Sequence, residues 1–188
     1  MNADGMVARV AFGGSQAQGE GFSIILIARY VLETCSRVRD AARALCRIPV
    51  ALSQNVTVLD RSGAHATVYL APDRSPSVSR TTTVCANHQD PLDSLALTPG
   101  VSRSLRRQAA VLRTLEMPGV SLAHLQKAFF VTPLYSREAK SPTVYTAVYR
   151  PAALTVDYLW PGHVMTQRIG SFTPDEYVHD YGDLGSLA

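Results

Sequence analysis

A thiol and two polar side chains lie close together in residues 81–89, which read Thr-Thr-Thr-Val-Cys-Ala-Asn-His-Gln. The β-branched residues predict a strand over residues 80–87. Neighbouring residues of a strand point to opposite faces, so Cys85 and Asn87 would share a face and His88 would point away from Asn87. An amide at the end of a strand can donate hydrogen bonds to an active site, which makes Asn87 the first candidate.

Two of these residues also have a purely structural interpretation. The Asn87 amide could cap the end of the strand and satisfy backbone groups of the following loop. His88 could contact a substrate or bond to that loop, and the loop is the preferred interpretation.

The three cysteines offer a second arrangement. Cys85 paired with His88 or His65 would form the nucleophile and base of a cysteine hydrolase. Cys35 and Cys46 fall on predicted helices among apolar neighbours, where cysteine is typical of a packed core.

The elements that would position these residues follow from the hydrophobic pattern. Further strands are predicted over Val7–Phe12, 55–59, 64–71, 143–150 and 154–160. Helices are predicted over Ile24–Thr34, from a cap at Ser36 to before Pro49, and over about 102–115 and 121–129. Loops are predicted over 72–79 and 90–100. Helix pairs between antiparallel hairpins predict a layered α+β domain.

Two local features of this pattern are specific. Ser23 is a candidate cap for the first helix, whose first half is apolar on nearly all sides and is therefore predicted to be buried against a sheet. In the return strand of the first hairpin, Ala66, Val68 and Leu70 are predicted to share one face.

Composition excludes several classes of function. The chain has 188 residues, 46% of them hydrophobic and 18% charged, as expected for one globular domain. The net charge is only +3 and the basic residues form no stripe, so no nucleic acid is predicted as a partner. The apolar run of residues 22–28 is too short to span a membrane, and no membrane partner is predicted. An odd number of cysteines and the lack of a signal peptide predict a cytoplasmic protein.

A cluster of arginines marks the third predicted helix: Arg103, Arg106, Arg107 and Arg113. Arg103 and Arg107 are one turn apart and could bind an anion, such as a carboxylate or the phosphates of a coenzyme A thioester. A solvated helix face is the preferred interpretation.

Seven short stretches, taken in order, resemble one family of enzymes. They are Met-Asn-Ala-Asp-Gly-Met at 1–6, Arg-Tyr-Val-Leu-Glu-Thr-Cys at 29–35, Asn-Val-Thr-Val-Leu-Asp at 55–60 followed by Gly63, Ala-Asn-His-Gln at 86–89, Pro-Leu-Tyr at 133–135, Thr-Ala-Val-Tyr-Arg-Pro at 146–151 and Trp-Pro-Gly at 160–162. Together they resemble the linear-amide hydrolases and acyltransferases of the N-terminal-nucleophile class. Isopenicillin N acyltransferase is the nearest type, and choloylglycine hydrolase and penicillin V acylase are relatives. The resemblance covers about residues 1–165.

The resemblance implies a four-layer αββα sandwich of the Ntn-hydrolase type, truncated at its N-terminus. The domain would span residues 1–170, followed by an acidic, frayed tail over 171–188. The family nucleophile lies upstream of the matching region. In this class a cysteine becomes the first residue after self-cleavage, and its own α-amine is the general base for its thiol.

The resemblance also assigns roles to residues of this chain. Asn87 would donate one hydrogen bond to the oxyanion of the tetrahedral intermediate. A second donor would come from the end of the Val7–Phe12 strand, where the Phe12 side chain cannot donate and only a backbone N–H near Phe12 or Gly13 could. Phe12, Gly13 and His88 would line the substrate site. The implied substrate is a small acyl amide or thioester (an acyl-amino acid, a penicillin-like amide or an acyl-CoA), with no cofactor and no metal.

Three expectations follow from a nucleophile outside the chain. The chain alone would be inactive, as part of an amidase or acyltransferase. Strands missing from the sandwich would leave a sheet edge uncovered, which favours homo-oligomers. Alternatively, the chain is a non-catalytic binding or interaction protein that retains the fold.

Overall fold

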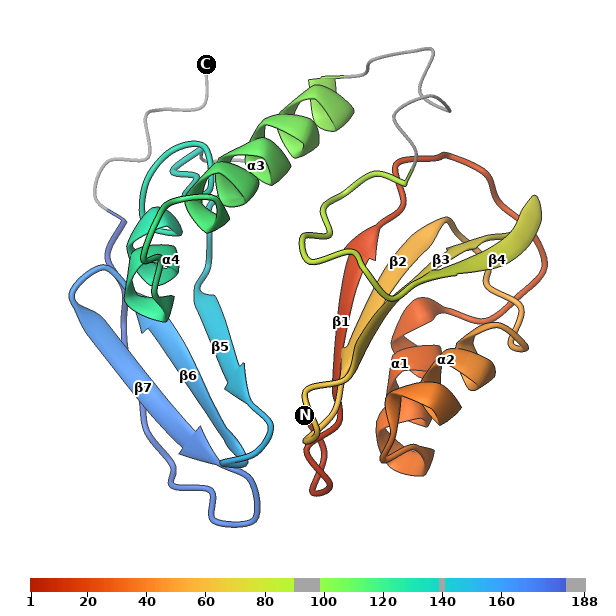
Figure 1. Ribbon diagram of the computed structural model, residues 1–188, viewed down its shortest axis with the longest axis horizontal. Helices are drawn as coiled ribbons and strands as arrows, with labels where there is room; N and C mark the ends of the chain where they lie inside the picture. The colour runs from red at the N-terminus through yellow and green to blue at the C-terminus, as the bar shows by residue number, and fades with distance from the viewer. Residues whose placement is uncertain (90–98, 139–140, 182–188) are drawn as a thin grey trace.

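The computed structural model describes residues 1–89, 99–138 and 141–181 of the chain. In this part of the chain, seven strands form two antiparallel sheets, and four helices pack around them (Figure 1). The arrangement is mixed α/β and agrees with the predicted α+β class. The predicted loop over residues 90–100 lies largely outside the described residues.

The first sheet has the strand order β1-β2-β3-β4. Its strands are β1 Val7–Phe12, β2 Gln54–Leu59, β3 His65–Ala71 and β4 Arg74–Ser79. β1 pairs with β2 from Val7 opposite Leu59 to Phe12 opposite Gln54, and it forms one edge of the sheet. The prediction of a loop over 72–79 is wrong, because the chain turns at residues 72–73 and β4 then pairs back onto β3.

Two helices cover one face of this sheet: α1 Ile24–Thr34 and α2 Val38–Leu45 (Figure 1). The predicted inward face of β3 is confirmed, since Ala66, Val68 and Leu70 are all buried in the core. Ile27 and Val31 of α1 pack into the same core. The spacing of four residues gives α1 a single inward stripe.

α1 lies against the sheet, as predicted, but its apolar first half buries only one stripe there. Ile25 is 75% exposed, and Leu26 and Tyr30 are also exposed. A helix lying on a sheet buries only the stripe that faces it. The described residues place nothing on the outer side of α1, so these apolar side chains stay in solvent.

The helix caps come from distant residues rather than from the predicted serines. Ser23 makes no side-chain cap bond, and Arg37 rather than Ser36 holds the N-cap position of α2. The first backbone N–H of α2, on Val38, donates to the carboxylate of Asp60 at 3.0 Å. A carboxylate at a helix N-terminus satisfies a free N–H and interacts well with the helix dipole.

Asn2 performs the corresponding role at the end of α1. Its amide donates to the carbonyls of Leu32 and Cys35 at 2.9 and 3.0 Å, and its Oδ1 accepts from the Met6 N–H at 2.8 Å. The amide N–H groups of Asn2 thus tie the start of the chain to the end of the helix, and its oxygen closes the turn that leads into β1.

The second sheet has the order β5-β6-β7. Its strands are β5 Thr146–Arg150, β6 Thr155–Trp160 and β7 His163–Arg168. The sequence pattern predicted the first two and missed β7. The remaining helices, α3 Pro99–Leu115 and α4 Leu122–Ala128, pack on each other. In Figure 1, α3 crosses above both sheets. No helix in the described ranges is both long and apolar enough to cross a membrane.

Aromatic rings gather on the second sheet around Trp160, the only tryptophan of the chain. The Trp160 ring lies 6.1 Å from Tyr145 and 5.0 Å from Tyr177. Tyr177 stacks on His163 with ring centres 3.7 Å apart. Tyr177 belongs to the predicted tail, whose described residues run along this sheet. The division of the chain at residue 170 stays a prediction.

Candidate oxyanion site

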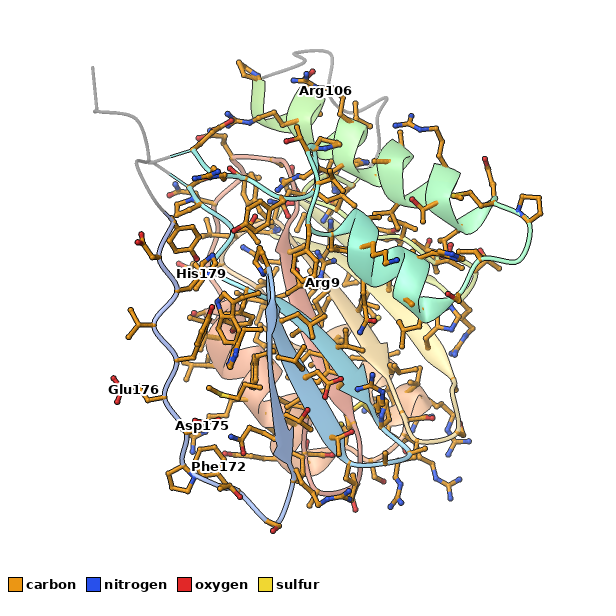
Figure 2. All side chains as sticks on the ribbon, turned by 90° about the vertical axis from the view of Figure 1, so that its left-hand side faces the viewer. Arg9, Arg106, Phe172, Asp175, Glu176 and His179 are labelled. Atoms are coloured by element: carbon orange, nitrogen blue, oxygen red, sulfur yellow. The ribbon has the colours of Figure 1, made fainter. Side chains whose placement is uncertain are left out.

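Residues 80–87 do not form the predicted strand. Side chains of the first sheet bind the carbonyls of this segment on the face away from α1 and α2. The buried amide of Asn55 donates to the carbonyls of Ala86 and His88 at 2.9 and 2.8 Å, and Arg9 donates to the carbonyl of Cys85 at 2.8 Å. Because these backbone groups are bonded by side chains, the segment can cross the sheet instead of extending it. Figure 2 shows Arg9 pointing from the first sheet.

Asn87 lies between the two carbonyls that Asn55 holds. Its side chain is half-buried, and no hydrogen bond of its amide occurs among the described residues. A structural cap would have its amide bonded to backbone, whereas a donor for a reaction intermediate must be free. The backbone around Asn87 is therefore fixed while its amide remains available.

The turn after β1 packs directly on this segment. Gly14 has a φ of +83°, and a Cβ placed there would lie 3.1 Å from the Cα of His88 and 3.4 Å from the carbonyl oxygen of Asn87. Glycine allows both the backbone conformation and the close approach. The structure thus brings the end of β1 next to Asn87.

Only one of the two backbone donors considered at this turn is free. The Gly13 N–H donates to the carbonyl of Ser53 at 3.0 Å. In an antiparallel pair, successive residues alternate between pointing toward the partner strand and pointing away from it. The N–H of Phe12 therefore points away from β2, along the free edge of the sheet. The Phe12 side chain is 44% exposed and contributes no polar atom.

Two buried polar atoms beneath this turn have no partner in the described structure: Ser53 Oγ and Asn55 Oδ1. A Cβ on Gly13 would lie only 2.1 Å from Ser53 Oγ, so the turn sits tightly on that hydroxyl. Buried groups of this kind are rare in native proteins, and a functional role is one of their explanations. Two further such atoms, His65 Nε2 and His163 Nε2, lie away from this turn. Asn55 belonged to a recognised motif, but its part in holding Asn87 could not be seen without the fold.

His88 is buried and faces α3 instead of an open site. Its Nδ1 lies 2.8 Å from Ser104 Oγ and its Nε2 lies 3.1 Å from Gln108 Oε1. The Gln108 amide in turn donates to the carbonyl of Val84 at 3.2 Å. Both ring nitrogens of His88 are thus engaged in fastening α3 to the segment. The sequence pattern did not indicate Ser104 or Gln108.

The cysteines lie apart from any base. Cys85 Sγ faces the carbonyl of Ala86 at 3.8 Å, and no hydrogen bond joins it to His65 or His88 in the described structure. Cys35 is buried in the core. Cys46 is at the end of α2, where burial raises the pKa of its thiol and disfavours the reactive thiolate.

The arginine cluster divides along α3. Arg103 forms an exposed ion pair with Glu138 at 3.6 Å, so a second anion would compete with this carboxylate. Arg106 lies on the exposed side of the helix (Figure 2). A solvated helix face remains the preferred interpretation of the cluster.

The order of the motifs agrees with a comparison of whole sequences. A family model for acyl-coenzyme A:6-aminopenicillanic acid acyl-transferase matches residues 1–163. The chain belongs to this family. The match to the acyl-transferase family spans β1 through β6, and with them Asn55, Asn87 and the turn after β1. No curated protein matches the chain.

Proposed function

We propose that this chain supplies the oxyanion-binding part of a cysteine-nucleophile enzyme that hydrolyses linear amides or transfers their acyl group. The observation that carries the proposal is the Asn87 amide, which has no partner in the described structure while Asn55 fixes the carbonyls on either side of it. Membership of an acyl-transferase family gives the class of reaction.

The reaction assigns each group a role. A cysteine thiol loses its proton to a base and attacks the carbonyl carbon, forming a C–S bond and a tetrahedral oxyanion. The Asn87 amide and the Phe12 N–H donate hydrogen bonds to that oxyanion. When the intermediate collapses, the C–N bond breaks, the amine leaves with a proton, and an acyl-enzyme remains for water or an amine to attack.

The nucleophile in this proposal comes from a segment upstream of residue 1. None of the three cysteines has a base within hydrogen-bonding reach in the described structure, and Cys35 and Cys46 lie on the helix side of the sheet. An upstream cysteine whose own α-amine serves as base needs no histidine beside it. The substrates would be acyl-amino acids, penicillin-like amides or acyl-CoA thioesters, and the complete fold would be the four-layer sandwich.

The free edge of β1 supports a second proposal, that the isolated chain forms homo-oligomers. Outward-pointing N–H and C=O groups of an edge strand can pair with another strand. Val10 and Phe12 on this strand are both exposed and apolar. Size-exclusion chromatography with light scattering should show a dimer or larger species, and a monomer at high concentration contradicts the proposal.

The catalytic proposal is tested by comparing two proteins in one assay. The 188-residue chain and a longer protein translated from the in-frame upstream codons are given penicillin V, acyl-amino acids and acyl-CoA esters. We expect turnover only by the longer protein, unchanged by Cys85→Ala. Turnover by the chain itself that is lost on Cys85→Ala would overturn the assignment. Substrate binding by both proteins without turnover would support a non-catalytic binding protein instead.

A further inference from the structure

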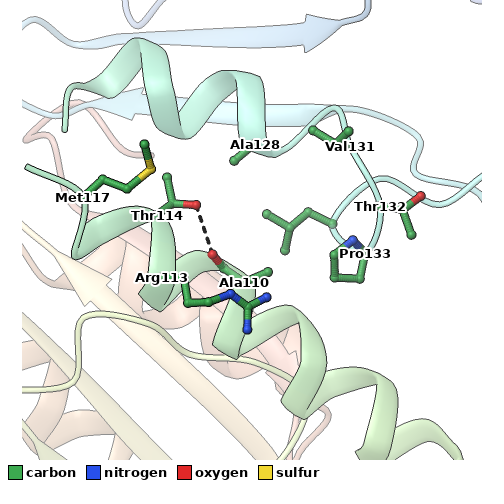
Figure 3. Close-up of a pocket in the computed structure, with 9 residues that line it drawn as sticks. Ala110, Arg113, Thr114, Met117, Ala128, Val131, Thr132 and Pro133 are labelled. Atoms are coloured by element: carbon green, nitrogen blue, oxygen red, sulfur yellow. Dashed lines mark hydrogen bonds between the residues drawn. The ribbon is translucent and has the colours of Figure 1, made fainter.

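A cavity of about 420 Å³ lies between α3, α4 and the loop after α4 (Figure 3). This volume falls within the range of about 300–1,000 Å³ that is usual for small-molecule sites. It is lined by Ala110, Arg113, Thr114, Met117, Ala128, Val131, Thr132, Pro133 and Leu134.

The walls of this cavity are mainly apolar in what they offer a ligand, apart from the hydroxyl of Thr132 and the guanidinium of Arg113. The hydroxyl of Thr114 donates to the carbonyl of Ala110 at 3.0 Å, as the dashed line in Figure 3 shows. The backbone groups around the cavity are also bonded to one another, for instance Met117 N–H to Thr114 and Val131 N–H to Ala128. A ligand would therefore meet methyl, methylene and thioether groups along most of its length.

Arg113 is the only charged residue of the lining. No hydrogen bond or ion pair of its guanidinium occurs in the described structure, in contrast to Arg103, which is paired with Glu138. A guanidinium can hold a carboxylate with two parallel hydrogen bonds. The cavity thus combines a mainly apolar lining with one guanidinium that is available to bind an anionic group.

The cavity is separate from the candidate oxyanion site. Ser104 and Gln108, one turn apart on α3, face His88. Ala110, Arg113 and Met117 recur at three- and four-residue spacing and line the cavity. At 100° per residue these positions lie on the opposite side of the helix from Ser104 and Gln108. A ligand here would leave the contacts of Asn87 and His88 in place.

We propose that this cavity binds a small amphipathic carboxylate, with its apolar body between α3 and α4 and its carboxylate on Arg113. The assignment rests on the lining and on the charge of Arg113, and it is independent of the proposed catalytic function. The apolar walls account for the chain of the ligand, and the guanidinium selects a negative head group over a neutral one.

The test uses octanoate as the probe and neutral octanol as its matched comparison, with binding followed by amide NMR shifts of the 188-residue chain. The Arg113→Gln substitution removes the positively charged guanidinium from the lining. Arg106→Gln removes the same charge from the same helix, two turns earlier and outside the lining. We expect saturable octanoate binding with shifts at residues 110–117 and 131–134, weakened at least tenfold by Arg113→Gln and unchanged by Arg106→Gln. Octanol should bind at least tenfold more weakly than octanoate.

Three results would overturn the proposal: no saturable binding up to millimolar octanoate, equal losses in the two arginine variants, or shifts centred on another part of the chain. A cavity-filling change, Ala110→Phe, gives a second arm that leaves the charge intact. It should abolish octanoate binding while the rest of the spectrum stays folded, and normal binding by this variant would also contradict the proposal.

Discussion

Where β1 begins, Asn2 and Asp60 are bonded within the protein and one buried atom, His65 Nε2, lacks a partner in the described structure, whereas where β1 stops three polar groups lack one. At the first end Asn2 uses its amide and its oxygen to close α1, and Asp60 accepts from the start of α2. At the second end the Asn87 amide, Ser53 Oγ and Asn55 Oδ1 have no partner in the described structure.

This difference separates residues that hold the fold from residues that are available for chemistry. All belong to the region matched by the acyl-transferase family model, so membership of the family does not distinguish them. Hydrogen bonding distinguishes the two groups of residues. A bonded polar group stabilises the native state, whereas a buried polar group without a partner destabilises it unless a ligand or reaction intermediate bonds to that group.

The largest expected effect is on the rate of an active, upstream-extended protein carrying Asn87→Ala. Loss of one oxyanion donor should lower kcat by about 10²–10³ while KM changes little, because the oxyanion exists only in the transition state and intermediate. The melting temperature should stay nearly constant, since this amide bonds to nothing in the described structure. A structural cap would give the reverse, a lower melting temperature with nearly normal kcat.

Asn55→Ala should have the next largest effect, now on stability. It leaves the carbonyls of Ala86 and His88 without their donor, and an unsatisfied buried group costs about 1–3 kcal/mol. Urea unfolding measures the loss. Arg9→Met is the matched control, because it removes an exposed bond to the neighbouring Cys85 carbonyl and should cost less than about 1 kcal/mol. Equal losses in the two variants would contradict the role given to Asn55.

Asp60→Ala should destabilise the protein by about 0.5–2 kcal/mol, the usual range for a helix cap. The same carboxyl predicts a dependence on pH. Burial alone would raise the pKa of Asp60, but hydrogen bonds from the Ser62 hydroxyl and from the backbone of Val38, Ser62 and Ala64 outweigh it and lower the pKa.

A carboxyl with a lowered pKa in the folded state contributes stability above its unfolded pKa of about 3.9 and loses it as the pH falls through the folded pKa. Urea unfolding between pH 7 and pH 3 should therefore show an acid-side loss of stability that is smaller in Asp60→Ala. An identical acid-side loss in both proteins would remove Asp60 as a source of this dependence.

The smallest effect is expected from Ser53→Ala at the unbonded end. Its hydroxyl is buried without a partner, so removing it should leave the free energy of unfolding unchanged or raise it by up to about 1 kcal/mol. Thermal and urea unfolding of this variant measure the change. A loss above 1 kcal/mol would show that the hydroxyl is bonded in solution, and the contrast between the two ends would weaken.

The sequence predicted local elements well where a short pattern decides them. β1 and α1 have the predicted bounds, since alternation and a four-residue apolar spacing are visible within a few residues. The segment 80–87 has the composition of a strand, yet Asn55, Arg9 and Gln108 bind its carbonyls from 24 to 76 residues away. Such contacts depend on the tertiary fold, and no window of sequence contains both partners.

Asn87 itself could be selected from the sequence, because it lies in a motif with a known type of chemistry. The contacts that position the residues around Asn87 could not be predicted from the sequence. The choice of Phe12 over Gly13 as backbone donor depends on the pairing of β1 with Ser53 and Gln54, 40 residues further along the chain. The engagement of His88 by Ser104 and Gln108 depends likewise on where α3 packs.

The position of Trp160 limits what intrinsic fluorescence can report. The only tryptophan is surrounded by Tyr145, His163 and Tyr177 at the second sheet. Its emission will follow the melting of β5–β7 and of the segment that carries Tyr177. If the two sheets unfold at different denaturant concentrations, emission and far-ultraviolet circular dichroism will give two different midpoints. Only the dichroism will then report the unfolding of the first sheet, whose Asn55 bonds the carbonyls on either side of Asn87.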